Sequence, residues 1–173
     1  SMKTRLESDS IGTLEVPSDA YYGVQSLRGK QNFPITGHPM HRLLIISLAQ
    51  IKKAAAQANR HAGTLDPAIA DAIIEASDEI IAGKLHDQFI VAANMNANEV
   101  IANRAIEILG GTKGDYAVLH PNDHVNMAQS TNDVYPTAGK LTALALLPEV
   151  FNQLNRLYEA LEVKAVEFDD VVK

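Results

Sequence analysis

Apolar residues recur at helical spacing in several successive segments after residue 43. The first stripe comprises Leu44, Leu48, Ile51, Ala55, Ala58 and Ala62. Steps of three and four residues place these side chains on one face of a helix, whereas Lys52 and Lys53 lie off that face. Gly63 follows the last apolar position and is a typical helix terminator. We therefore expect a helix that ends at Gly63.

Two further helices are predicted between residues 66 and 111. Asp66 and Pro67 suit the N-cap and first position of the second helix, and Gly83 suits its end. The third helix is expected to run from about Asn96 to Leu109, before Gly110-Gly111. The apolar stripes of the two helices are Ile69, Ile73, Ala76 and Ile80, and Ala97, Ile101, Ala105 and Ile108.

The last segment has the longest stripe. It comprises Leu147, Val150, Leu154, Leu157, Leu161, Ala165 and Phe168. We expect a long helix from about Pro136 onward, broken or bent near Pro148, with no strand in 150–168. Such a stripe needs apolar partners, and other subunits are the natural source.

Residues 1–42 lack a helical period. Proline and glycine recur along them, so we expect irregular structure with short strands or turns around Gly12–Val16.

Composition narrows the class of protein. The 173 residues suit a domain with a sizeable core, and 46% hydrophobic content is ordinary for a globular protein. The net charge of −6 disfavours nucleic acid or an anionic membrane as a partner. The absence of cysteine excludes disulfides and thiolate metal sites. Without an apolar signal region or a membrane-length apolar run, a cytoplasmic location is expected.

The segment from His120 to Asp133 is unusually polar. Its amides and hydroxyls are typical of loops that bind small ligands. The same residue types also form turns and helix caps, so Ser130, Thr131 and Asn132 could simply cap the following helix. The two interpretations are compatible, because a helix N-terminus is itself an anion site.

Two other polar groups stand out. His120 and His124 have the i, i+4 spacing of zinc ligands, but Pro121 disturbs the helix and no third ligand is evident, so no metal is expected. Asn94, Asn96 and Asn98 alternate at the start of a helix. Either they cap it, or they form part of a buried polar network.

Three stretches resemble signatures of the fumarase/aspartase superfamily. They are Glu7-x-Asp9-Ser10-Ile11-Gly12 with Tyr21-Tyr22-Gly23-Val24-Gln25, Asn94-Met95-Asn96-Ala97-Asn98-Glu99-Val100, and His120-Pro121-Asn122-Asp123-His124-Val125-Asn126 with Gln129-Ser130-Thr131-Asn132-Asp133. The resemblance implies a mainly α fold. Residues 1–135 would form the superfamily's N-terminal domain, and residues 136–173 the first long helix of its central helical bundle.

Within the superfamily the chain looks most like an aspartate ammonia-lyase. Tyr21-Tyr22-Gly23-Val24, Asp87-Gln88-Phe89 and Ser130-Thr131-Asn132 are aspartase-like. The implied reaction is elimination of ammonia from L-aspartate to fumarate through an aci-carboxylate, without a cofactor. Fixed hydrogen-bond donors would stabilise that intermediate. The alternatives are a fumarase fragment and a helical scaffold without catalysis.

The resemblance also assigns residues. It places Ser130, Thr131 and Asn132 at a substrate carboxylate, and His120, Asn122 and Asp123 at a secondary anion site. The catalytic base belongs to a part of the family that lies beyond Lys173. Sites of the family are assembled in homotetramers, so we expect self-association of a full-length parent and no activity from this chain alone.

One family element is missing before the asparagine signature. A Gly-rich loop ending in Gly-Thr-Ser is expected there, yet Val91 is followed directly by Ala92. A true deletion and an omitted mobile loop are both compatible with the sequence. If a mobile loop is omitted, the Cα atoms of Val91 and Ala92 should lie much farther apart than the ~3.8 Å of a trans peptide. We predict that wide separation.

Overall fold

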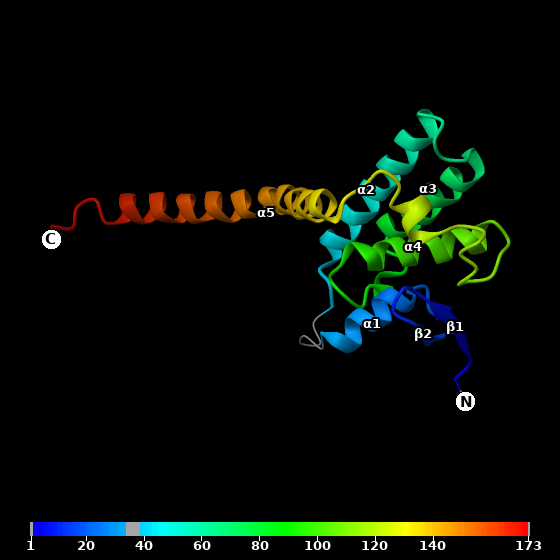
Figure 1. Ribbon diagram of the computed structural model, residues 1–173. Helices are drawn as coiled ribbons and strands as arrows, with labels where there is room; N and C mark the ends of the chain where they lie inside the picture. The colour runs from blue at the N-terminus through cyan, green and yellow to red at the C-terminus, as the bar shows by residue number, and fades with distance from the viewer. Residues whose placement is uncertain (1, 34–38, 173) are drawn as a thin grey trace.

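The computed structural model describes residues 2–33 and 39–172, and it is mainly helical, as expected (Figure 1). In the described residues the elements are β1 (Thr4–Ser8), β2 (Thr13–Pro17), α1 (Val24–Asn32), α2 (Arg42–His61), α3 (Pro67–Ile81), the 3₁₀ turn η1 (His86–Gln88), α4 (Asn94–Ile108), the π-helical turn η2 (Pro121–Val125) and α5 (Thr131–Glu167).

Helices α2 and α3 begin and end close to the predicted positions. The Asp66 carboxylate accepts hydrogen bonds from the amides of Ala68 at 2.9 Å and Ile69 at 3.2 Å, which makes it the N-cap of α3. Gly63 follows α2 with φ +76°, a left-handed conformation that favours glycine. Helix α4 starts at Asn94, earlier than predicted, so all three asparagines of the signature belong to it.

The core lies between α2, α3 and α4. Leu48 of α2, Ile73 and Ile80 of α3, and Val100 and Ile106 of α4 are fully buried there. Burial of each such side chain contributes about 1.5–3 kcal/mol. This packed layer supports η2 and the loop after it, because Leu119 and Val125 join the same core.

Helix α5 leaves this body and extends far beyond it (Figure 1). Its first turns pack on α2 through the buried Val134 and Ala138. From Leu147 to Phe168 the predicted apolar stripe is exposed. Although α5 is long, no helix of the described residues is apolar enough over sufficient length to cross a bilayer.

The predicted start of this helix is wrong in detail, because it begins at Thr131 rather than near Pro136. It remains one helix through Pro148, so the predicted break is absent. Each proline removes one backbone hydrogen bond from a helix. Pro148 lies in an exposed stretch where water can satisfy the carbonyl left free, and the intact turns on either side maintain the helix. Residues 150–167 contain no strand, as predicted.

The N-terminal region is more regular than predicted. Strands β1 and β2 form an antiparallel hairpin in which Thr4 pairs with Pro17 and Ser8 with Thr13. The prediction of wholly irregular structure is wrong for α1, which spans Val24–Asn32. Its N-cap Gly23 has no side chain to cap it, so the sequence there carries no local helix signal. Residues 34–38 lie outside the described residues.

The chain is continuous at Val91–Ala92. The amide of Ala93 donates a hydrogen bond to the carbonyl of Val91 at 2.9 Å, so a tight turn joins η1 to α4. The side-chain oxygen of Asn96 accepts from the amides of Ile90 at 2.7 Å and Val91 at 3.0 Å. The predicted wide separation of the Val91 and Ala92 Cα atoms is therefore wrong. Asn96 stabilises a short connection at this position.

Candidate functional site

Two helices begin at the same pocket. Its volume is about 670 Å³. It is lined by Ala92, Ala93, Asn94, Met95 and Asn98 at the start of α4, by Thr131, Asn132, Tyr135 and Pro136 at the start of α5, and by Asn122 and Asn126. The asparagine signature and the Ser-Thr-Asn signature, which lie far apart in the sequence, thus form opposite walls of one site.

The helix N-termini give this pocket a positive electrostatic character. The N-cap of α4 is Ala93, whose side chain cannot accept a hydrogen bond from the first amides of the helix. At α5 the Ser130 hydroxyl accepts from the amide of Asn132 at 3.2 Å. Free amides and the helix dipole favour an anion near each N-terminus by roughly 0.3–1 kcal/mol. Two such termini suit a ligand with two negative groups.

Two residues that line the pocket carry acceptors without donors. Asn94 and Asn98 are 3% and 2% exposed, and their buried Oδ1 atoms have no hydrogen-bond partner among the described residues. An unsatisfied buried polar atom costs about 1–3 kcal/mol. A small movement of these side chains toward the pocket would let a ligand donor remove that cost.

A buried lysine lies behind the pocket. Lys52 of α2 is completely buried, and its ammonium donates to Asn126 Oδ1 at 3.0 Å and Gln129 Oε1 at 2.9 Å. Burial lowers the pKa of Lys52 to about 7. Asn94 Nδ2 donates to the same Asn126 oxygen at 3.0 Å and to Thr131 Oγ1 at 3.3 Å.

Sequence reasoning missed Lys52. Its position off the apolar stripe of α2 indicated a surface lysine, like its neighbour Lys53. The side chain instead enters the polar interior formed by Asn126 and Gln129, more than 70 residues away in the sequence. Periodicity along one helix carries no signal for such a contact.

The structure separates the three predicted carboxylate ligands. Thr131 and Asn132 line the pocket together with Asn94. Ser130 caps α5 and lines a different hollow of about 170 Å³. The helix-cap interpretation therefore fits Ser130, and the ligand-binding interpretation fits the position of Thr131 and Asn132.

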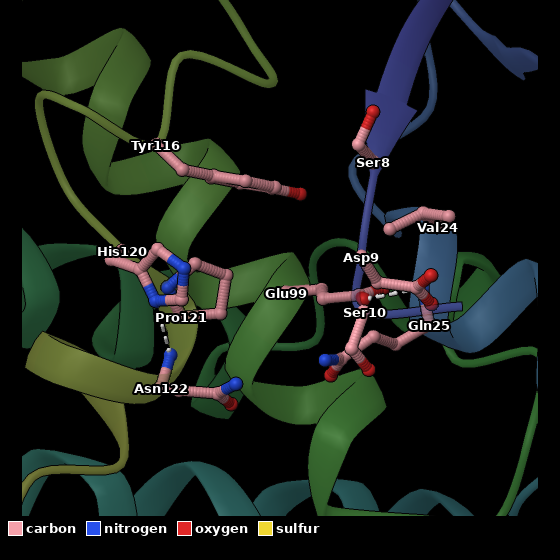
Figure 2. A pocket seen from close by; sticks show the side chains of 10 residues that line it. All are labelled: Ser8, Asp9, Ser10, Val24, Gln25, Glu99, Tyr116, His120, Pro121 and Asn122. Carbon is pink, nitrogen blue, oxygen red and sulfur yellow. Dashed lines mark hydrogen bonds between the residues drawn. The ribbon is translucent and has the colours of Figure 1, made fainter. Parts of the chain in front are cut away.

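A second cavity contains part of the predicted secondary anion site. Figure 2 shows His120, Asn122 and Tyr116 facing Ser8, Asp9, Ser10 and Gln25 around about 220 Å³. His120 Nδ1 accepts hydrogen bonds from the amides of Asn122 at 3.1 Å and Asp123 at 3.3 Å. The Asp123 side chain is 78% exposed and does not line this cavity. The structure thus brings His120 and Asn122 together there, without the Asp123 carboxylate.

The histidine pair is occupied by backbone contacts. His124 Nδ1 accepts from the amide of His120 at 2.8 Å, and His120 Nδ1 accepts from the two amides of η2. Where the structure describes the chain, histidine, aspartate and glutamate nowhere gather in a group of three that could hold a metal ion.

Glu99, at the edge of Figure 2's cavity, serves a different purpose from the asparagines before it. Its buried carboxylate accepts from the amides of Gly23 at 2.5 Å, Gln25 at 2.8 Å and Ser26 at 3.2 Å. It therefore caps α1 from a distant helix. Burial raises the pKa of Glu99, while these hydrogen bonds oppose the shift.

Comparison with known proteins agrees with these features. A family model described as lyase matches residues 12–173. The aspartate ammonia-lyase of Bacillus subtilis is 49% identical over 178 aligned residues, and the alignment covers 98% of this chain. The class II fumarate hydratase of Halobacterium salinarum is 51% identical over 179 residues, also covering 98% of the chain. A crystal structure of fumarate lyase:delta crystallin from Brucella melitensis bound to cobalt matches 95% of the chain with 48% identity and a TM-score of 0.90.

The comparisons also bear on length. The chain spans 38% of each of these relatives. Both sequence alignments exceed the 173 residues of the chain, so each relative has additional residues inside the matched region. A loop missing at Val91–Ala92 would produce such a difference. Because aspartases and fumarases match at similar identity, overall identity does not separate the two substrates.

Proposed function

The chain belongs to the lyase family that includes aspartate ammonia-lyases and class II fumarate hydratases, and from this premise we propose that it forms part of an aspartate ammonia-lyase. The activity belongs to a larger assembly, of which this chain supplies one wall of the site. Its ligand is a four-carbon dicarboxylate, L-aspartate in one direction and fumarate in the other.

One observation carries the choice of ligand. The pocket combines two helix N-termini, which suit carboxylates, with two lining residues, Asn94 and Asn98, whose buried amide oxygens lack donors. The ammonium group of aspartate has three donor protons and can serve both oxygens once the two side chains turn toward the ligand. The hydroxyl of malate has one. The residue pattern around Tyr21-Tyr22-Gly23-Val24 and Ser130-Thr131-Asn132 supports the same choice.

The chemistry follows from the donor set. A base removes the C3 proton beside one carboxylate, and the C–H electron pair passes into that carboxylate as an aci-carboxylate. The pair then returns to form the C2=C3 double bond, and the C2–N pair leaves with ammonia. Thr131 and Asn132 would donate to the carboxylate as its charge grows, and Ser130 would support the α5 N-terminus that carries them.

Fumarase activity is the second candidate function, because a class II fumarate hydratase shares as much identity with the chain as an aspartase does. The test is a parallel assay of the full-length enzyme that contains this chain, with L-aspartate and L-malate. We expect ammonia and fumarate from aspartate. Turnover of malate without deamination of aspartate would overturn the aspartase proposal and establish the fumarase.

The exposed apolar stripe of α5 supports association with further helices. Val150, Leu154, Leu157 and Leu161 are all at least half exposed, and such a row is typical of a helix that packs in a bundle. We expect a homotetramer for the full-length enzyme and no fumarate from the 173-residue chain alone. Light scattering of the enzyme and a deamination assay of the chain test the two expectations separately.

A further inference from the structure

The buried ammonium of Lys52 has no acidic partner. None of the ion pairs of residues 2–33 and 39–172 includes it, and its two hydrogen bonds go to side-chain amides. Enclosing an unpaired lysine is costly. Packing alone therefore does not explain why a lysine occupies this buried position.

The amides that receive Lys52 have a fixed orientation. Gln129 Nε2 donates to the carbonyls of Val125 at 2.9 Å and Met127 at 3.2 Å, and Asn126 Nδ2 donates to the carbonyl of Gln129 at 3.1 Å. Carbonyl oxygens only accept, so both NH₂ groups must face them. The Oε1 and Oδ1 atoms therefore face Lys52, which donates to both.

The orientation of the Asn126 amide fixes that of Asn94, which lines the pocket. Asn126 Oδ1, already bound to Lys52, also accepts from Asn94, so Nδ2 of Asn94 must face it. The same Nδ2 donates to Thr131 Oγ1. Two consequences follow: the Thr131 hydroxyl proton is not used toward Asn94, and Asn94 Oδ1 is left without a donor among the described residues.

We infer that Lys52 is a positioning residue that sets the hydrogen-bond polarity of the pocket. Through Asn126 it holds Asn94 with Nδ2 toward Thr131, and through Asn94 it keeps the Thr131 hydroxyl as a donor to a ligand carboxylate. Without Lys52, only the Gln129 carbonyl holds the Asn126 amide. The amides of Asn126 and Asn94 are then less firmly fixed, and Thr131 can donate to Asn94 instead of to the ligand. This inference rests on the proposed dicarboxylate site and deepens it.

The charged groups of the surrounding elements do not substitute for Lys52. In α3, Asp78 pairs with Lys53 at 2.7 Å, and in α4, Glu99 faces the N-terminus of α1. Other titratable groups of the neighbouring segments include Asp123 and His124 of η2 and Asp133 and Lys140 of α5. Among the described ion pairs, none of these groups contacts Lys52.

The test uses the 173-residue chain and two lysine variants. Lys52→Met removes the buried donor, whereas Lys53→Met removes the adjacent exposed lysine and serves as the control. The first measurement is the side-chain amide NMR signals of Asn94 and Asn126 without ligand. The second is the affinity for fumarate of the wild type, both variants, Thr131→Ala, and the double variant Lys52→Met/Thr131→Ala.

We expect Lys52→Met to shift the Asn94 and Asn126 signals and to weaken fumarate binding about ten- to hundredfold, the usual effect of one charge-assisted hydrogen bond. Lys53→Met should change neither. Because Lys52 acts through Thr131, the double variant should bind no more than about twofold more weakly than Thr131→Ala alone. Additive losses, or unchanged Asn94 signals in a folded Lys52→Met variant, would overturn the inference.

Two further outcomes are informative. If Lys52→Met does not fold, the wild type decides the question, because the Asn94 amide signal should change with the same pH midpoint as the Lys52 ammonium. An Asn94 signal that stays constant through that midpoint contradicts the relay. If neither the wild-type chain nor the full-length enzyme binds fumarate, the proposed function fails, while the ligand-free amide signals of the chain still test the role of Lys52.

Discussion

The two faces of α4 use similar polar residues for opposite purposes. On one face Asn96 and Glu99 are fully satisfied: Asn96 binds the amides of Ile90 and Val91, and Glu99 binds those at the start of α1. On the other face Asn94 and Asn98 line a pocket, and each keeps an unpartnered oxygen. Burial alone therefore does not distinguish a satisfied asparagine from an unsatisfied one.

The two faces differ in whether their polar groups have all their hydrogen-bond partners. A satisfied polar group stabilises the chain by joining elements that are distant in sequence, as Glu99 joins α1 to α4. An orphaned group destabilises the free chain, and only a binding partner justifies it. Substitutions on the two faces should accordingly move different observables, stability on one face and ligand affinity or turnover on the other.

The largest expected effect is on the satisfied face, at Gly23. A Cβ there would lie 2.5 Å from the Tyr116 hydroxyl and 2.7 Å from Glu7 Oε1. Gly23→Ala should therefore lower the free energy of unfolding by about 3 kcal/mol or more. Gly29→Ala is the matched control, because its Cβ would meet only Val91 at 3.7 Å. Urea unfolding measures the free energy of unfolding of both variants. Equal values for Gly23→Ala and Gly29→Ala would show that the α1–α4 junction is not tightly packed.

Next in size is the effect on the pocket face. In the full-length enzyme, Thr131→Ala and Asn132→Ala should each slow deamination with little loss of fold. Ser130→Ala removes a helix cap and should slow deamination through the position of the α5 N-terminus. Removing one donor to developing negative charge costs on the order of 10²–10³ in rate. Steady-state kinetics with L-aspartate tests this, and thermal unfolding checks the fold. Wild-type turnover in all three variants would mean that these residues only cap α5.

A sharper comparison uses two asparagines of one helix. Asn96→Ala leaves the amides of Ile90 and Val91 without their acceptor, so stability should fall by about 2–4 kcal/mol. Asn98→Ala removes an unsatisfied oxygen and should change stability by less than about 1 kcal/mol. The affinity for L-aspartate should show the reverse order. Asn98→Ala should bind L-aspartate more weakly while its fold is retained, because it lacks an acceptor for the ammonium group. Equal destabilisation of both variants would erase the distinction between the faces.

A gradual effect, small over a fraction of a pH unit, is the pH dependence contributed by Lys52. Its pKa falls from 10.5 to about 7 on folding, so between these values the unfolded chain binds more protons than the folded chain. Stability should therefore rise with pH across that window, by at most about 1.4 kcal/mol per pH unit from this group. Below pH 7 the full cost of the buried charge is present. Comparison of urea unfolding from pH 7 to 10 should show this rise in Lys53→Met and its loss in Lys52→Met.

Much of the helical fold could be predicted because its signals are local. The cap at Asp66, the terminator Gly63 and the apolar stripes all act within a few residues, so α2 and α3 were located closely. Helix α1 could not be predicted in this way. Its cap is Glu99, more than 70 residues away, and no property of Gly23 or its neighbours indicates that contact.

The sequence by itself determined the residue types of the site, the caps and stripes of the central helices, and the resemblance that placed Thr131 and Asn132 at a ligand. Only the tertiary structure decided which polar groups are satisfied. It brought the starts of α4 and α5 to one pocket, turned Glu99 toward α1, and enclosed Lys52 beneath Asn126. The physical reason is that the role of a buried polar atom depends on its partners across the fold, and those partners are not its neighbours along the chain.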